Sequence, residues 1–292
     1  MGIINVTPDS FYAESRILNT DLAVARALEL EELGADIVDI GGESTRPGST
    51  SIDTDEEIRR VIPIVEGVRK RSNILISVDT SKPEVTARAL DLGADIINDI
   101  TGLGTSHLYS SHRGEPPDTQ GDRETGGNHN HEEREETGTL IARSSAFVVL
   151  MHMRGTPFDM QNMAHYNDVA AEVSAELDIA VQRALHAGIH RDRIILDPGI
   201  GFAKTAEQNL QLLKNLHLLK AKGYPILVGL SRKSFLGVYT GREPEERLVP
   251  SVAANAISIF QGADIIRVHD VAEAVDTVRI VNAIMDPRPE GP

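Results

Sequence analysis

Three parts of the chain carry the same short phrase where a helix-like stretch meets an apolar run. The phrase is Gly-Ala-Asp, and it occupies residues 34–36, 93–95 and 262–264, followed by Ile-Val in the first copy and by Ile-Ile in the other two. A Gly at such a boundary is typical of a left-handed helix C-cap. An unbroken β-branched run is typical of a strand that is buried on both faces of a parallel sheet. The pattern therefore predicts a helix-to-strand turn that is used repeatedly in an α/β protein.

Extending this reading along the chain predicts eight strands, separated by amphipathic stretches that have the helical period. The expected strands are Ile3–Asn5, Ile37–Ile40, Ile74–Asp79, Ile96–Asp99, Phe147–Met151, Ile194–Asp197, Ile226–Leu230 and Ile265–Val268. The expected helices are Asp21–Leu33, Asp55–Arg71, Glu84–Leu92, Asp168–Ala187, Ala206–Lys222, Val249–Gln261 and Ala272–Ile284. Eight alternating units predict a single-domain (β/α)₈ TIM barrel over residues 1–292.

One connection is longer than such a barrel needs. Forty-four residues separate Gly102 from Phe147, where a loop, a helix and a return loop need about 20 to 25. Residues 104–139 are rich in Gly, His, Glu, Asp and Thr, with eight acidic and three basic side chains. This composition predicts a disordered insertion between the fourth and fifth strands. The segment contains four histidines, but they have no paired spacing on a predicted element that would favour a metal site.

Composition and charge exclude several classes of protein. The 29 Lys and Arg against 44 Asp and Glu give a net charge of −15, which argues against a protein that wraps a nucleic-acid backbone. The chain has no cysteine, so disulfides, thiolate metal sites and a cysteine nucleophile are excluded. Its apolar runs are far shorter than the roughly 20 residues that span a bilayer. We therefore expect a cytoplasmic protein that binds neither nucleic acid nor membrane.

Polar side chains collect where the predicted strands end, which is the end at which TIM barrels carry their chemistry. Carboxylates and amides end the middle strands, at Asp79, Asn98 and Asp197, whereas cations follow the second, seventh and eighth strands. These cations are Arg46, Lys233, Arg267 and His269. Ionised Asp accepts two hydrogen bonds and suits a heterocycle with adjacent N–H groups, and cations suit an anion. The predicted substrate is a polar heterocycle that carries phosphate.

These strand-end segments, taken together, resemble the dihydropteroate synthases, which are pterin-binding (β/α)₈ barrels. The resemblance rests on seven or more ordered blocks that cover nearly the whole chain outside the insertion. The blocks are residues 1–11 (MGIINVTPDSF), 39–48 (DIGGESTRPG), 77–80 (SVDT), 97–99 (IND), 151–155 (MHMRG), 197–202 (DPGIGF), 231–234 (SRKS) and 267–271 (RVHDV).

The resemblance implies the condensation of p-aminobenzoate with 6-hydroxymethyl-7,8-dihydropterin diphosphate, which releases pyrophosphate, in folate biosynthesis. It also implies Mg²⁺ as cofactor, small-molecule partners and a homodimer. By similarity, the pterin would contact Thr45, Asp79, Asn98, Asp197, Gly229 and Lys233, and the diphosphate would contact Asn5, Arg46, Arg267 and His269, with Asn5 also ligating the metal. Thr45, Pro47, Phe202 and Ser234 would frame p-aminobenzoate. The expected catalytic residues are Asp79, Lys233, Arg267 and His269.

The sequence departs from the family pattern in three places. Residues 12–16 lack the usual acidic and glycine-rich run, the first strand begins without the family's usual leading segment, and the insertion has no family counterpart. Two other functions share some of these sequence features. A corrinoid-dependent methyltransferase shares the barrel but has no need for diphosphate-binding cations, so Arg46, Lys233, Arg267 and His269 favour the synthase. A noncatalytic paralogue remains an alternative, which intact Asn5 and Thr45 oppose.

Overall fold

The computed structural model describes residues 1–6, 16–46, 48–106 and 128–287. The strands in these ranges are β1 (Gly2–Asn5), β2 (Ile37–Gly41), β3 (Leu75–Asp79), β4 (Ile96–Asp99), β5 (Phe147–Met151), β6 (Ile194–Asp197), β7 (Leu227–Gly229) and β8 (Ile265–Arg267). The helices are α1 (Arg16–Glu32), α2 (Thr54–Arg69), α3 (Pro83–Asp91), α4 (Asn128–Arg143), α5 (Val169–His186), α6 (Ala206–Lys214), α7 (Leu216–Lys220), α8 (Ser234–Thr240), α9 (Leu248–Phe260) and α10 (Val271–Met285).

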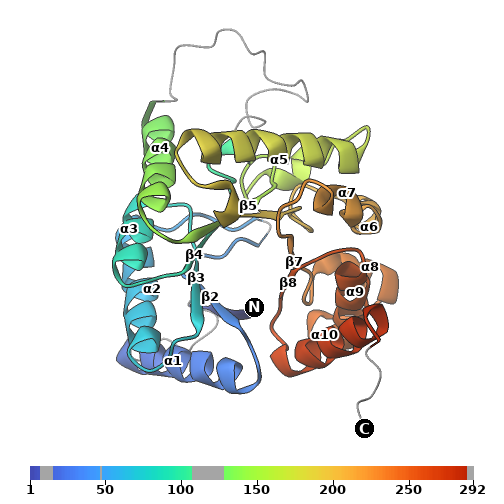
Figure 1. The fold of residues 1–292 in the computed structure, drawn as a ribbon, viewed down its shortest axis with the longest axis horizontal. Coiled ribbons are helices and arrows are strands. Elements are labelled where there is room, and N and C mark those ends of the chain that lie inside the picture. The colour runs from blue at the N-terminus through green and yellow to red at the C-terminus, as the bar shows by residue number, and fades with distance from the viewer. Residues whose placement is uncertain (7–15, 47, 107–127, 288–292) are drawn as a thin grey trace.

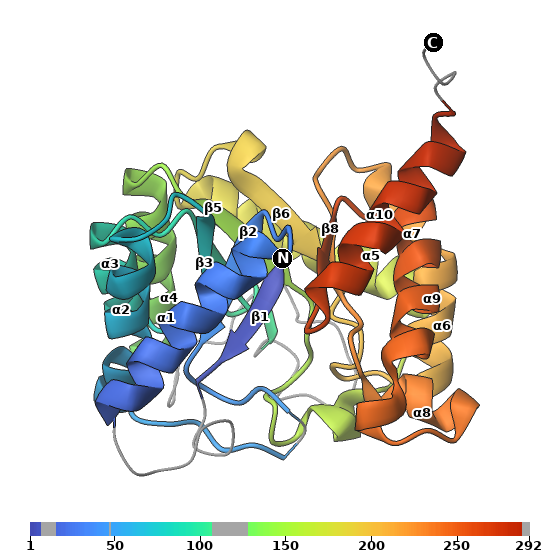
Figure 2. The same cartoon turned by 90° about the horizontal axis from the view of Figure 1, so that it is seen from below.

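The strands form a closed parallel barrel with the helices outside it (Figure 1, Figure 2). Strands β1 to β6 pair in chain order, and β7 pairs with β8. Two isolated parallel bridges, Leu196 with Ile226 and Gly2 with Val268, join these two groups. The backbone N–H of Ile3 donates to the carbonyl of Val268 at 3.0 Å, and the N–H of Val268 donates to the carbonyl of Met1 at 3.0 Å. The predicted TIM barrel is therefore confirmed.

The Gly-Ala-Asp phrase has the predicted role and an additional one. Gly34, Gly93 and Gly262 all have positive φ, between 82° and 107°, so each helix ends in the left-handed conformation that Gly adopts without strain. In two of the three copies, the Asp also accepts a hydrogen bond from the backbone of the neighbouring strand segment. Asp95 Oδ2 accepts from the backbone N–H of Ile76, and Asp264 Oδ2 accepts from that of Ile226, both at 2.8 Å. The repeated phrase thus ends a helix and aligns the next strand.

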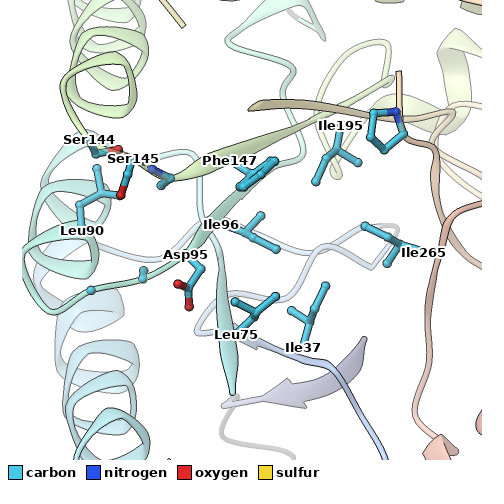
Figure 3. A pocket seen from close by; sticks show the side chains of 14 residues that line it. Ile37, Leu75, Leu90, Asp95, Ile96, Ser144, Ser145, Phe147, Ile195 and Ile265 are labelled. Atoms are coloured by element: carbon cyan, nitrogen blue, oxygen red, sulfur yellow. Dashed lines mark hydrogen bonds between the residues drawn. The ribbon is translucent and has the colours of Figure 1, made fainter. Parts of the chain in front are cut away.

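Two apolar layers follow from the alternation of side chains along each strand. The larger layer lies between strands and helices and includes Val38, Ile76 and Ile97. The smaller one includes Ile37, Ile96 and Ile195, which alternate with the outer set and therefore face the barrel interior. Residues near the amino ends of the strands also line an apolar cavity of about 420 Å³ (Figure 3). Apolar side chains thus occupy the amino-terminal half of the barrel interior.

The connection between β4 and β5 differs in part from the prediction. Residues 107–127 lie outside the described residues, but Asn128–Arg143 forms helix α4, so the end of the predicted disordered span of 104–139 is helical. Thr137 and Ile141 are buried, and a Cβ placed on Gly138 would lie 2.8 Å from the Cβ of Ala187. This helix was missed because it buries small side chains by close approach instead of presenting an apolar stripe.

Other differences are smaller. The single helix expected over Ala206–Lys222 is two, α6 and α7, which meet at Asn215, and the short α8 was not predicted. None of the described helices is long and apolar enough to cross a membrane.

Candidate active site

The alternation of side chains that fills the amino-terminal half of the barrel interior with apolar groups also directs polar side chains inward at the carboxyl ends of the strands. Two residues beyond the inward-facing Ile37, Ile96, Ile195 and Ile265 come Asp39, Asn98, Asp197 and Arg267, which therefore face inward as well. The strand register places Asn5 beside Gly41, Gly41 beside Asp79 and Asp79 beside Asn98. The barrel interior is thus apolar toward the amino ends of the strands and polar toward their carboxyl ends.

Two carboxylates share one guanidinium at this polar end. Arg267 Nε donates to Asp39 Oδ2 at 2.6 Å, and its Nη2 donates to Asp79 Oδ2 at 3.1 Å. Asp39 is completely buried and also accepts from Ser77 Oγ at 2.5 Å and, more weakly, from Asn98 Nδ2 at 3.4 Å. The structure therefore brings the predicted residues Asp79, Asn98 and Arg267 together around Asp39.

The charge state of Asp79 follows from this arrangement. Burial raises the pKa of Asp79 to about 7, Arg267 opposes the shift, and the Asp39 carboxylate adds to it. One guanidinium cannot fully compensate two buried carboxylates. Asp79 therefore has a charge that can change near neutral pH.

A second cluster joins the β6–α6 loop to the residues after β7. Lys233 Nζ donates to the carbonyl of Ile200 and lies 4.6 Å from the centroid of the Phe202 ring. Burial lowers the pKa of Lys233 to about 8, while the Asp197 carboxylate opposes the shift. Burial also raises the pKa of Asp197, against the effect of Lys233. A Cβ on Gly201 would lie 3.1 Å from Lys233 Cδ, so the absence of a side chain at Gly201 allows the Lys233 side chain to pack directly over the loop backbone.

Cations gather beyond β8. His269 Nδ1 lies 3.0 Å from Ser231 Oγ, and burial together with the charges of Arg267 and Arg232 lowers the pKa of His269 to about 4. Its imidazole is therefore neutral near pH 7. The exposed Arg46 contributes to the same lowering, which places its charge near His269. Arg232 adopts φ 59° and pairs with Asp270 at 2.6 Å, so a carboxylate already engages its guanidinium.

The remaining predicted residues occupy less constrained positions. Asn5 ends β1, and Gly229 ends β7 in register with Arg267. Thr45 is half-buried on the loop after β2, and Ser234 is the exposed first residue of α8. Pro47 lies outside the described residues, as do residues 7–15 of the first loop.

Comparisons with known proteins agree with this geometry. The pterin-binding enzyme family matches residues 1–269. The dihydropteroate synthase of Escherichia coli K12 is 41% identical over 285 residues, which cover 98% of this chain and 91% of that protein. The structure of Xanthomonas albilineans dihydropteroate synthase with 4-aminobenzoic acid has a TM-score of 0.81 at 41% identity, and the match covers 99% of this chain and 93% of that one. A structure of the same enzyme with 7,8-dihydropteroate has a TM-score of 0.79 at 38% identity, covering 99% and 94%.

This chain belongs to the dihydropteroate synthase family. The structure also places two residues, Asp39 and Lys204, at or next to the site that were not among the predicted site residues. Asp39 was assigned only to the end of the second strand. Its position two residues after Ile37, which puts it inside the barrel beside Ser77, is the pattern that could have identified it. The burial of Lys204 in the β6–α6 loop could not be predicted from the sequence, because a lysine after a glycine-rich segment is normally exposed.

The metal predicted for this dihydropteroate synthase family member has a limited set of protein ligands. In the described part of the chain, no group of three or more His, Asp or Glu side chains could hold a metal ion. Asp39 and Asp79 are both engaged by Arg267. Mg²⁺ commonly keeps several waters and binds through one or two carboxylates together with substrate phosphates. The donor set therefore fits a metal that is held largely by a diphosphate, with Asn5 as an additional amide ligand.

Proposed function

We propose that this protein condenses p-aminobenzoate with 6-hydroxymethyl-7,8-dihydropterin diphosphate to give 7,8-dihydropteroate and pyrophosphate. The observation that carries the proposal is that the mouth of one barrel holds buried carboxylates, two of them paired with Arg267, together with the basic side chains Lys233, Arg46 and His269. The carboxylates suit the N–H groups of a pterin, and the cations suit a diphosphate. The ligands in the two Xanthomonas albilineans structures, 4-aminobenzoic acid and 7,8-dihydropteroate, are of the same chemical kind.

The pterin ring would lie between the Asp39–Asp79–Arg267 cluster and the Asp197–Lys233 cluster. Asp197 would accept from a ring N–H and the exocyclic amine, while Asn98 and Lys233 would complete the polar pairing at the ring edges. Gly229, in register with Arg267 at the end of β7, and Thr45, on the loop after β2, would border the ring. Asp79 would lie nearest the reacting methylene.

The diphosphate would occupy the cationic group, in contact with Arg46, Arg267, His269 and Asn5. Neutral His269 can donate one hydrogen bond to a phosphate oxygen, and the added negative charge favours its protonation. Mg²⁺, held by Asn5 and the phosphate oxygens, would neutralise charge on the leaving diphosphate. These groups all stabilise negative charge that grows as the leaving group departs.

The bond changes require little proton chemistry from the protein. The methylene carbon–oxygen bond breaks, and its electron pair leaves with pyrophosphate. The positive charge that develops on the methylene is shared with the electron-rich dihydropterin, and a negatively charged Asp79 favours it. The aryl amine of p-aminobenzoate then forms the new carbon–nitrogen bond and loses its proton to solvent. A weakly basic aniline needs no strong general base for this step.

The second substrate would lie over the β6–α6 loop. The Phe202 ring offers an apolar surface, and Ser234 at the first turn of α8 offers a hydroxyl to the carboxylate. Thr45 and Pro47 would close the opposite side. The test is a coupled pyrophosphate-release assay with the purified protein. Release that requires both substrates is the expected result, and release that is absent, or that proceeds without p-aminobenzoate, contradicts the proposed reaction.

We also propose that the protein forms a homodimer through helices α9 and α10. Six large apolar side chains on these helices are each more than half exposed: Val249, Ile257, Phe260, Ile280, Ile284 and Met285. A patch of this kind on a folded protein marks an interaction surface. Light scattering should give a dimer mass, and Ile280→Lys should give a monomer. Val238→Lys, which changes an equally exposed side chain on α8, should leave the dimer intact. The expected cytoplasmic location stays a prediction.

A further inference from the structure

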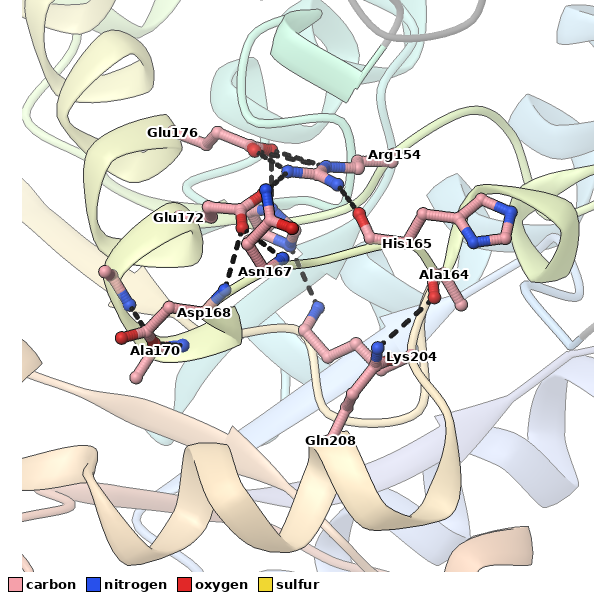
Figure 4. Close-up of polar contacts among 12 residues, drawn as sticks. Arg154, Ala164, His165, Asn167, Asp168, Ala170, Glu172, Glu176, Lys204 and Gln208 are labelled. Atoms are coloured by element: carbon pink, nitrogen blue, oxygen red, sulfur yellow. Dashed lines mark hydrogen bonds and ion pairs between the residues drawn. The ribbon is translucent and has the colours of Figure 1, made fainter. Parts of the chain in front are cut away.

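A chain of four buried charged or polar side chains lies behind the β6–α6 loop. Its members are Lys204, His152, Glu176 and Arg154, all less than 10% exposed. Glu176 of α5 contacts both His152 and Arg154. Its Oε2 lies 2.8 Å from His152 Nε2, and its carboxylate pairs with Arg154 (Figure 4). Arg154 also pairs with Glu172 at 2.8 Å. This cluster is close to the site, but the reaction described above does not use it.

The hydrogen bonds of the cluster define its protonation. Lys204 Nζ lies 3.0 Å from the Gly199 carbonyl, 2.9 Å from the Phe202 carbonyl and 2.9 Å from His152 Nδ1. Three acceptors match the three N–H groups of an ammonium. His152 Nδ1 must then be the unprotonated nitrogen, so Nε2 carries the proton and donates to Glu176. Burial and the nearby Lys204 charge lower the pKa of His152 to about 4, which agrees with a neutral ring.

The two carbonyls belong to the loop that carries the site. Between them lie Ile200, whose carbonyl accepts from Lys233, and Gly201, which Lys233 crosses. Phe202 itself lies against Lys233. Lys204 therefore grips the loop on both sides of the residues that face the substrates.

The loop needs such a grip because its backbone is unusual. Gly199 has φ 64° and Ala203 has φ 49°, and a side chain in this region is strained. A Cβ on Gly199 would lie 1.8 Å from the His152 carbonyl, so the loop packs directly against the backbone that follows β5. Burial lowers the pKa of Lys204 to about 7, while Asp197 and Glu176 oppose the shift. Burial thus disfavours the charge of the ammonium, and the neighbouring carboxylates favour it.

We propose that Lys204 is a positioning residue, whose ammonium, oriented by His152 and Glu176, holds the β6–α6 loop in the conformation that places Phe202 and the Ile200 carbonyl for p-aminobenzoate and Lys233. This inference rests on the proposed function for its kinetic part. Lys204 touches neither substrate in this arrangement. Loss of its ammonium leaves the Phe202 carbonyl and His152 Nδ1 without this donor. The Gly199 carbonyl then keeps only the N–H of Phe202, and the loop relaxes away from Lys233.

The kinetic test compares Lys204→Met with Lys220→Met, a change at an exposed lysine that pairs with Asp264 far from the site. We expect Lys204→Met to raise the KM for p-aminobenzoate at least tenfold and to lower kcat about tenfold, and Lys220→Met to change neither by more than twofold. Lys204→Gln retains two donors and should be intermediate, and it carries the comparison if the Met variant does not fold. Unchanged KM and kcat in folded Lys204 variants overturn the proposal.

A rescue experiment separates the ammonium from the shape of the side chain. The chain has no cysteine, so in Lys204→Cys the new thiol is the only one. Alkylating it with 2-bromoethylamine in the unfolded chain and refolding restores an ammonium at nearly the original length. Recovery of the KM for p-aminobenzoate to within about fivefold of wild type is expected, and refolded, alkylated protein that keeps the variant's KM contradicts a role for the ammonium.

A measurement without substrates keeps this inference separate from the proposed reaction. Hydrogen exchange of the amides in residues 199–203 should be at least tenfold faster in Lys204→Met or Lys204→Gln than in wild type, with β3 unchanged. Equal exchange rates in the variant and the wild type overturn the proposal that Lys204 holds the β6–α6 loop. A wild type without turnover refutes the proposed function alone, since the exchange result still decides whether Lys204 holds the loop.

Discussion

Asp39→Asn removes one negative charge from the centre of the site with almost no change of shape. Asp39 is completely buried and holds Arg267 Nε at 2.6 Å. The Asn oxygen can still accept from Arg267, and its amide can donate to the Ser77 hydroxyl, which can also accept. The substitution therefore tests the charge and leaves most of the hydrogen-bond geometry in place.

The expected change in the free energy of unfolding combines two losses and one gain. Replacing a charge-assisted hydrogen bond with a neutral one costs about 1 kcal/mol. Loss of the attraction between unit charges about 4 Å apart costs up to about 4 kcal/mol at an effective dielectric constant of about 20. The variant no longer buries a carboxylate, which offsets several kcal/mol, and Arg267 keeps Asp79 at 3.1 Å. We expect a net loss of about 2 kcal/mol in the free energy of unfolding.

Arg267 in this variant should move toward Asp79, its remaining carboxylate, and away from the diphosphate. We therefore expect kcat/KM for the pterin diphosphate to fall about 30-fold, which corresponds to about 2 kcal/mol in the barrier. Stability is measured by urea unfolding with linear extrapolation, and kcat/KM by pyrophosphate release.

A matched control is available at the opposite end of the barrel. Asp95 also lies 2.6 Å from an arginine, Arg69, and accepts from a strand N–H, but it is about one third exposed. Asp95→Asn should lower the unfolding free energy by about 1 kcal/mol and leave kcat/KM within twofold. A change below about 0.5 kcal/mol in Asp39→Asn, together with unaltered kcat/KM, would refute the reasoning that Asp39 holds Arg267 by charge.

Three further outcomes are expected. Asp197→Asn should weaken binding of a pterin without diphosphate by about 1 to 3 kcal/mol, because the amide presents a donor to a ring donor; an unchanged dissociation constant by calorimetry contradicts the pairing. Chelation of Mg²⁺ should weaken binding of the pterin diphosphate but hardly affect binding of the pterin alone, because the proposed metal would be held by Asn5 and phosphate oxygens and not by the ring; equal losses for both ligands contradict this proposed role. Asp79 has a folded pKa of about 7, above its usual 3.8, so it contributes stability at low pH that is lost as the pH rises through that window. Relative to wild type, Asp79→Asn should therefore gain about 2 kcal/mol of stability between pH 5 and pH 8, and a constant difference in urea unfolding across these pH values contradicts the raised pKa.

The strands could be predicted almost completely because their burial leaves a direct mark on the sequence. A strand covered on both faces must be apolar throughout, and the Gly-Ala-Asp phrase marks where three of them begin. Helix α4 escaped prediction for the opposite reason. It has few aliphatic side chains, and its packing depends on the close approach of Gly138 to Ala187, which no local pattern announces.

The sequence by itself determined which residue types stand at the carboxyl ends of the strands, because strand length and the alternation of side chains follow from local periodicity. The grouping of these residues was decided by tertiary structure. Asp39 and Arg267 lie 228 positions apart and become partners only when the barrel closes. Burial then raises the pKa of Asp79 and lowers that of Lys204, and it turns a lysine that reads as a surface residue into a clamp on the loop. Such effects depend on the removal of water from a group by distant parts of the chain, and therefore no local stretch of sequence contains them.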